Sequence, residues 1–262
     1  MDRGRIMPGM RGWSIGRLSH DTLTIAVMAA VLVAFCGYIA YAERQRAARR
    51  SPPSEYMPPV HPVSLAGAQL KGDRKARVAV IVHSDFICPA CGRFAIETLP
   101  KIEERYIAGG QVLLAMRHAP VGKIHSLAMK AAEAAHCAGE QERYWDMYRS
   151  IFSAQLDREY GRTEAAMFDN DIRAFATQIG LDTKAFESCL ASDAAAARVY
   201  SDAGSALALA IEATPSVLVG AIQPDGRVKV SRHFRGRPEE GALFGTIDGL
   251  LSRAHPPVQA AR

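Results

Sequence analysis

Residues 85–94 read Asp-Phe-Ile-Cys-Pro-Ala-Cys-Gly-Arg-Phe and place two residues between Cys88 and Cys91. A pair with this spacing can bind a metal, form a structural disulfide or exchange electrons with other thiols. A structural zinc site needs four ligands, and the three remaining cysteines of the chain are each isolated in the sequence. The nearest histidine is His83. The metal site is therefore the weakest of the three interpretations, and no metal ligand is assigned.

The residues around the pair favour redox chemistry over an inert bridge. Residues 77–84, RVAVIVHS, form a short apolar, β-branched run that predicts a buried strand. Cys88 stands where a helix should begin, with Pro89 at the first helical position. Free N–H groups and the helix dipole stabilise a thiolate there. Cys91, one turn further on, can then resolve a mixed disulfide.

The order of elements predicts an α/β fold with an inserted helical domain. Residues 92–110 are helical in composition, with a kink expected at Pro100 and a stop at Gly109-Gly110. Residues 111–117 predict a second buried strand, which completes a unit of strand, helix and strand. Alanine-rich segments with helical spacing then run from 124 to about 211 and predict about five helices. Two strands at 216–220 and 227–234, joined by the turn 223–226, and a helix at about 238–251 complete the order.

The positive charge of the chain is confined to its N-terminal part. The net charge of the 262 residues is +5, but residues 1–21 contribute +2 and residues 43–50 contribute +3. Residues 51–262 therefore sum to zero, and the large domain has no net attraction for nucleic acid. We expect no nucleic-acid partner.

One uncharged stretch lies between the two basic segments. Residues 22–42 contain 21 residues without a charge, and a helix of that length spans about 30 Å, the thickness of a bilayer core. We interpret it as a retained transmembrane anchor. A cleaved signal peptide is the alternative, because Ala40 and Ala42 form a weak small-x-small pattern. Cys36 lies within this segment as an apolar filler.

The predicted organisation has five parts. Residues 51–62 contain five prolines and predict an extended, semi-rigid spacer that would hold the folded domain away from the membrane surface. The parts are an N-terminal segment at 1–21, the anchor at 22–42, a basic and proline-rich linker at 43–62, the domain at 63–252 with its insertion at about 120–211, and a tail at 253–262.

A second motif lies far from the cysteine pair. Thr214-Pro215 directly precedes a predicted strand, where a proline is ordinarily tolerated. With this motif included, the chain resembles the DsbA-type thiol–disulfide oxidoreductases, and most closely their membrane-anchored branch. The stretches that carry the resemblance are SDFICPAC at 84–91, AAHCAGEQERYWDMYRSIF at 134–152, FESCL at 186–190 and ATPSVLVG at 213–220.

The resemblance covers residues 63–252 and implies a thioredoxin fold with a helical insertion. It implies that Cys88 is the exposed nucleophile and Cys91 the resolving cysteine. It also implies that Pro215 is a cis-proline facing the cysteines, with Thr214 before it. No cofactor is expected.

Three further residues carry expectations with an open alternative. Many thioredoxins have a buried acid six residues before the nucleophile, but this chain has Val82 there. Asp85 is the nearest acid, and it is either a proton-transfer group or a turn residue. Cys137 and Cys189, read from the sequence alone, are two buried thiols, whereas the resemblance implies that they form a structural disulfide. His125 and His136 are read as structural.

We therefore expect a membrane-anchored oxidoreductase that introduces disulfides into exported proteins. Stable disulfides belong outside the cytosol, so we expect a bacterial inner-membrane protein with a cytoplasmic N-terminus and a periplasmic catalytic domain. Its expected partners are the thiols of exported proteins and a membrane redox protein that re-oxidises or reduces the pair. The alternatives are a thiol reductant, for example in cytochrome maturation, an isomerase, and a non-enzymatic copper-binding or chaperone module.

Overall fold

The computed structural model describes residues 20–49, 59, 61–120, 126–158 and 165–254. The chain forms two compact units, Met1–Pro52 and Pro53–Arg262. In the first unit, helix α1 runs from His20 to Arg49, and apolar side chains such as Ile25 and Phe35 are exposed along it. The sequence predicted a transmembrane anchor here. Within the described ranges, none of the helices is long and apolar enough to cross a membrane.

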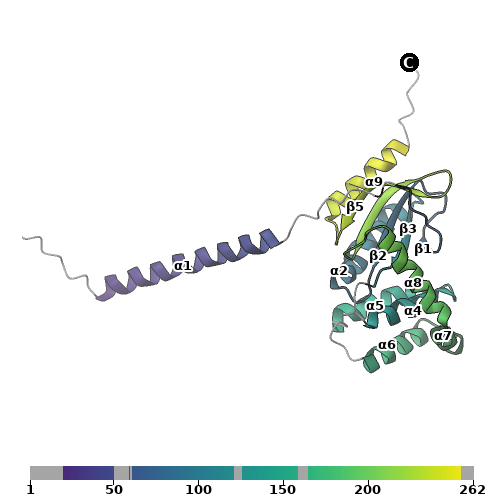
Figure 1. Ribbon diagram of the computed structural model, residues 1–262. Helices are drawn as coiled ribbons and strands as arrows, with labels where there is room; N and C mark the ends of the chain where they lie inside the picture. The colour runs from purple at the N-terminus through teal and green to yellow at the C-terminus, as the bar shows by residue number, and fades with distance from the viewer. Residues whose placement is uncertain (1–19, 50–58, 60, 121–125, 159–164, 255–262) are drawn as a thin grey trace, which may run out of the picture. The chain divides into compact units, whose positions relative to one another are not determined.

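The second unit is built on a five-stranded sheet with the order β1-β3-β2-β4-β5 (Figure 1). The central strand β2 pairs in parallel with β3 and antiparallel with β4, and β1 and β5 join antiparallel at the two edges. All residues of β2 and β3 are buried, as expected for strands covered on both faces. The strands are β1 Gln69–Lys71, β2 Val78–Ser84, β3 Val112–His118, β4 Ser216–Ile222 and β5 Val228–Arg235.

Successive residues of β2 face two different cores. Val78, Val80 and Val82 belong to the larger core cluster, which also contains Cys91. Ala79 and Ile81 belong to the smaller cluster on the other face of the sheet. Since side chains alternate along a strand, the next residue on the Cys91 side of the sheet is Ser84.

The segment after the cysteine pair is one helical run with two wider turns. It comprises α2 Pro89–Arg93, the π-helical turn η1 Phe94–Thr98, α3 Leu99–Ile102 and the π-helical turn η2 Glu103–Ile107. Pro100, where the sequence predicted a kink, lies in α3 between the two π-helical turns and supplies no N–H for the regular hydrogen-bond ladder. Gly110 has a φ of 67° just after the last turn, a conformation that glycine adopts without strain.

Five helices of the described chain lie between β3 and β4 and form the expected insertion. In Figure 1, α4 to α7 gather at one side of the sheet, and α8 leads back to it. The last helix, α9, packs Leu243 and Ile247 into the larger core. The helices are α4 Ser126–Gly139, α5 Tyr144–Arg158, α6 Ala165–Gln178, α7 Thr183–Leu190, α8 Asp193–Ala208 and α9 Glu240–Ala254.

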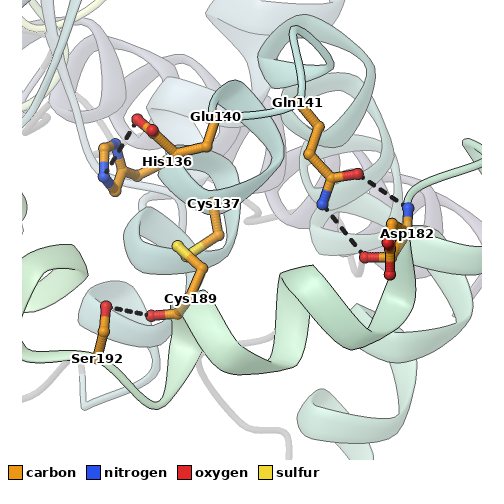
Figure 2. Close-up of a disulfide and its surroundings, with 7 residues drawn as sticks. All are labelled: His136, Cys137, Glu140, Gln141, Asp182, Cys189 and Ser192. Carbon is orange, nitrogen blue, oxygen red and sulfur yellow. Dashed lines mark hydrogen bonds and ion pairs between the residues drawn. A yellow bond between two sulfur atoms is a disulfide. The ribbon is translucent and has the colours of Figure 1, made fainter.

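A disulfide joins two helices of the insertion. Cys137 of α4 and Cys189 of α7 are bonded, with their Cα atoms 5.7 Å apart and a sequence separation of 52 (Figure 2). Gln141 and Asp182 also link the two regions. The Asp182 N–H donates to Gln141 Oε1 at 2.8 Å, and Gln141 Nε2 donates to the Asp182 carbonyl at 3.2 Å. The disulfide is therefore one part of a wider contact between α4 and α7.

A buried ion pair ties the insertion to the sheet. Asp202 of α8 accepts hydrogen bonds from Arg117 Nη1 at 2.9 Å and from the His118 backbone N–H at 3.2 Å. The side chains of Arg117 and Asp202 are 5% and 3% exposed, and Arg198 also pairs with Asp202. The carboxylate of Asp202 therefore compensates a charge at the end of β3 that would otherwise be buried alone.

Candidate redox site

Cys88 lies at the junction of β2 and the helical run that follows it. Its backbone is extended, with φ −74° and ψ 119°, and it forms the N-cap of α2 with Pro89 at the first helical position. The Cys88 N–H donates to the Asp85 carbonyl at 3.2 Å, and the Gly92 N–H donates to the Cys88 carbonyl at 3.1 Å. The loop is thereby held so that the sulfur of Cys88 faces the first turn of the helix, where N–H groups are unpaired.

The two cysteines differ sharply in accessibility. Both are free thiols, with Cys88 half-buried and Cys91 fully buried at 0% exposure. Another protein can therefore reach the sulfur of Cys88, whereas Cys91 is accessible only from within the loop.

Thr214 and Pro215 lie beside Cys88, as the resemblance implied. The peptide bond between them is cis, and the Cys88 thiol donates to the Thr214 carbonyl oxygen at 3.4 Å. Ser216 then begins β4, with its hydroxyl donating to the Ala213 carbonyl at 2.8 Å. The residues named as the pair and its facing loop are thus brought together by the fold.

The surroundings move the pKa values of the two thiols in opposite directions. Hydrogen bonds lower the pKa of Cys88 to about 6, above all the bond from the Cys91 side chain, and burial opposes this effect. Hydrogen bonds from the Thr214 side chain and from the backbone N–H groups of Cys91 and Ala90 lower it further. Cys88 is therefore largely a thiolate at neutral pH, the form that attacks disulfides.

Burial raises the pKa of the Cys91 thiol well above its usual value. The hydrogen bond to Cys88 and the charge of Cys88 raise it further, while the Asp85 backbone and the Ser84 side chain oppose the rise. Cys91 is therefore held as a neutral thiol while Cys88 carries the charge.

Asp85 occupies the turn between β2 and Cys88. Its side chain is buried, and Oδ1 accepts a hydrogen bond from the Ile87 N–H at 2.8 Å. Its backbone N–H points to the Cys91 sulfur at 3.4 Å. The carboxylate thus has the role of a turn residue, one of the two roles weighed from the sequence, and proton transfer through Asp85 stays a prediction.

The insertion contributes a residue that the sequence analysis did not identify. Gln155 of α5 is buried, and its Nε2 donates to the Ile87 carbonyl at 3.1 Å, directly before Cys88. A Cβ atom at Gly92 would overlap the Gln155 side chain and lie 3.0 Å from Leu156 Cδ2. The glycine after Cys91 therefore leaves the space that Gln155 occupies.

An aromatic cluster supports the same loop. Phe86 packs against Phe152, with ring centroids 4.8 Å apart, and against Tyr148 at 5.6 Å and His118 at 5.7 Å. Tyr148, in the stretch YWDMY at 144–148, thus packs beneath the redox loop. In the ranges that the structure describes, no group of three or more His, Cys, Asp or Glu side chains is arranged to hold a metal ion.

Comparison with known proteins agrees with this geometry. The family model described as Thioredoxin matches residues 66–232, which is more than half of the chain. The chain therefore belongs to the thioredoxin family.

Within that family the chain is of the DsbA type of thiol–disulfide oxidoreductase. The probable disulfide bond formation protein D of Bacillus anthracis is 32% identical over 153 residues, which cover 58% of this chain and 69% of that protein. The crystal structure of α-DsbA1 from Wolbachia pipientis has a TM-score of 0.62 and 25% identity, covering 73% of this chain and 94% of that chain. Oxidised BdbD from Bacillus subtilis shares the fold, with a TM-score of 0.60 and 22% identity over 73% of this chain and 96% of that chain.

Other relatives carry a different name. The Na⁺/H⁺ antiporter NhaA 3 of Salinispora tropica is 28% identical over 165 residues, which cover 63% of this chain but 23% of the antiporter. The chain thus spans about a quarter of the length of the antiporters that it matches. The name Na⁺/H⁺ antiporter applies to those whole proteins, of which this chain matches only a part.

Proposed function

We propose that the chain is a thiol oxidase that donates a Cys88–Cys91 disulfide to exported proteins. The observation that carries this proposal is the opposite treatment of the two thiols, with the pKa of half-buried Cys88 lowered to about 6 and that of buried Cys91 raised. Stabilising the thiolate of Cys88 favours the reduced form of the pair, and this makes the disulfide a stronger oxidant.

The reaction consists of two thiol–disulfide exchanges. A substrate thiolate attacks the sulfur of Cys88, the Cys88–Cys91 bond breaks, and Cys91 leaves as a thiolate that takes up a proton. A second substrate thiolate then attacks the substrate sulfur of the mixed disulfide, and Cys88 leaves as a thiolate. Two substrate thiols become one disulfide, and the enzyme pair takes up the two electrons. A redox partner must then remove those electrons, and we assign this role to a membrane protein.

The proposed location is the bacterial periplasm, with the N-terminus in the cytoplasm. The Cys137–Cys189 disulfide supports an oxidising compartment. Tethering to the inner membrane through residues 22–42 stays a prediction from the sequence. It is tested by fractionating cells that express the full chain, with alkaline carbonate extraction of the membranes. Release of the full-length protein by carbonate would contradict the tether.

The direction of electron flow is tested by measuring the reduction potential of the Cys88–Cys91 pair against glutathione. An oxidase should lie at about −180 mV or above, whereas a value near −270 mV, about that of a thioredoxin, would favour a reductant instead. Peptide mapping follows the redox state of Cys137 and Cys189 separately, so that the measured potential refers only to the Cys88–Cys91 pair.

The substrates are tested by trapping. Cys91→Ala leaves Cys88 able to attack but removes the resolving thiol, so mixed disulfides with exported proteins should accumulate and disappear on reduction. Cys88→Ala/Cys91→Ala is the matched control and should trap nothing. Equal amounts of adduct in both variants would contradict exchange at Cys88.

A further inference from the structure

The leaving sulfur of the proposed reaction is fully buried. Cys91 is 0% exposed, yet it must carry a negative charge whenever the Cys88–Cys91 bond breaks or forms. A buried anion is costly unless hydrogen-bond donors face it. This inference rests on the proposed exchange and concerns the groups that stabilise Cys91 during that step.

The backbone after β2 supplies one such donor. The Asp85 N–H lies 3.4 Å from the sulfur of Cys91. The position of this peptide is fixed because the Ala119 N–H donates to the Ser84 carbonyl at 2.8 Å. The sulfur of Cys91 therefore sits against the end of β2, at the peptide that joins Ser84 to Asp85.

Ser84 directs its side chain to the same face of the sheet. It follows Val82 by two residues, and Val82 shares the larger core cluster with Cys91. Val82 offers no polar group, so Ser84 is the β2 residue that presents a hydroxyl on this face. The residue is 5% exposed, and its Oγ is buried without a hydrogen bond of standard geometry.

Burying a hydroxyl without a hydrogen-bond partner destabilises a folded protein, so each such hydroxyl in a native structure calls for an explanation. The Ser84 hydroxyl lies beside the Cys91 thiol and lowers its pKa, against the larger effect of burial. The titratable groups that face Cys91 are Cys88 in the same loop and Tyr148 from α5, and the pKa of Tyr148 is itself raised in part by Cys91. Unlike Cys88 and Tyr148, the Ser84 hydroxyl does not titrate, and Ser84 follows Val82 on the face of β2 that shares the larger core cluster with Cys91.

We propose that the Ser84 hydroxyl is the second hydrogen-bond donor to Cys91 and stabilises its thiolate as the Cys88–Cys91 bond breaks or forms. When the Cys88–Cys91 disulfide oxidises a substrate, the Ser84 hydroxyl and the Asp85 N–H both donate hydrogen bonds to the departing Cys91 thiolate. In the reverse direction the hydroxyl holds the attacking thiolate of Cys91, which bonds to Cys88 and expels the substrate sulfur as a thiolate. The hydroxyl rotates to donate in the charged state, so no additional acid or base is consumed.

The test separates the two sulfurs in one experiment. The reduced full-length protein in mild detergent is mixed rapidly with an aromatic disulfide reagent that releases a coloured thiol. All variants carry Cys36→Ala, because Cys36 is a third free and exposed thiol that would also react. The first phase then reports attack by Cys88, and the second reports attack by Cys91 on the mixed disulfide. Ser84→Ala should slow the second phase about tenfold, as expected for losing a hydrogen bond to a charged group. The first phase should stay within about twofold of the wild type, because Cys88 has its own donors.

Two further variants control for packing. Thr98→Val removes another fully buried hydroxyl that lacks a partner, and it should leave both phases unchanged. Ser84→Thr keeps the hydroxyl and should restore most of the second phase. In Ser84→Ala the second phase should also need a higher pH to reach the wild-type rate.

The outcomes distinguish the inference from the function on which it rests. A second phase in Ser84→Ala that is within twofold of the wild type, over the whole pH range, would overturn the role of Ser84. Absence of the second phase in the wild-type protein would instead overturn the exchange between Cys88 and Cys91 itself.

Discussion

The sulfur of Cys88 lies 3.4 Å from the carbonyl oxygen of Thr214, although 126 residues separate the two in sequence. The strand order explains this proximity, because β2 and β4 are antiparallel neighbours and His83 pairs with Ser216. The last residues of β2 and the first residues of β4 therefore lie side by side at the same end of the sheet. The cysteine pair follows the first of these ends, and Thr214-Pro215 precedes the second.

The lowered pKa of Cys88 gives a pH profile for its alkylation. Iodoacetamide reacts with the thiolate, so the rate at Cys88 should rise with pH around a midpoint of about 6, instead of the ordinary 9.0. Mass spectrometry of the Cys88 peptide separates this reaction from that of Cys36. In Cys91→Ala the midpoint should move upward, because the largest cause of the shift is lost. An unchanged midpoint in that variant would contradict the role assigned to the Cys91 thiol.

Gly92 should not tolerate a side chain while Gln155 is present. Gly92→Ala places a Cβ on the Gln155 amide, which breaks its hydrogen bond to Ile87 and should cost about 1–3 kcal/mol of unfolding free energy. Gly245→Ala is the control, since a Cβ at Gly245 of α9 meets no atom within 4 Å.

Gln155→Ala supplies the second half of this test. Combined with Gly92→Ala it should be no less stable than Gln155→Ala alone, because the overlap has been removed. Additive losses of stability, measured by urea unfolding, would show that the two residues do not compete for the same space.

The Cys137–Cys189 disulfide should matter for stability rather than for chemistry. It closes a loop with a sequence separation of 52, which in the chain-entropy model contributes about 4 kcal/mol to the free energy of unfolding. Cys137→Ala/Cys189→Ala should therefore unfold at lower denaturant concentration, with Cys88 alkylated at the wild-type rate. A large change in that rate would mean that the insertion's disulfide affects the redox site.

The buried carboxylate of Asp202 should contribute far more to the free energy of unfolding than an exposed carboxylate does. Asp202→Ala leaves Arg117 buried without its partner, and we expect a loss of about 3–5 kcal/mol in the free energy of unfolding. Glu187→Ala breaks the exposed pair with Arg173 and should cost at most about 1 kcal/mol. Similar losses in the two variants, measured by thermal or urea unfolding, would contradict this account of the interface between α8 and β3.

The strands and the helical block could be predicted because their signals are local. The run at 77–84 corresponds to β2, and the insertion contains helices with clear apolar spacing. Strand β1 was not predicted, because three half-buried residues at 69–71 form no apolar run. A kink was expected at Pro100, whereas the two π-helical turns on either side of it were not predicted, because no local sequence signal marks them.

The part of the site whose residue types identify its chemistry could be predicted. The residues that contribute to the site only through packing were missed. Two cysteines and a proline at a helix start identify a redox pair in sequence. Ser84 and Gln155 are ordinary polar residues in the sequence. The structure shows that both are buried beside the cysteine pair, with few hydrogen-bond partners outside the redox loop. Local alternation gives the face of β2 on which Ser84 lies, but the packing of Cys91 against that face and the docking of α5 are not properties of the neighbouring sequence.

The unequal exposure of the two sulfurs also limits how a full catalytic cycle can run. In the proposed cycle, the protein that loads the disulfide and the protein that receives it must both bond covalently to Cys88, since Cys91 is inaccessible from outside. The two partners therefore cannot be bonded to the redox pair at the same time. A complete cycle should follow ping-pong kinetics, because the receiving thiol reacts with the disulfide form of the enzyme and the loading partner reacts with the dithiol form.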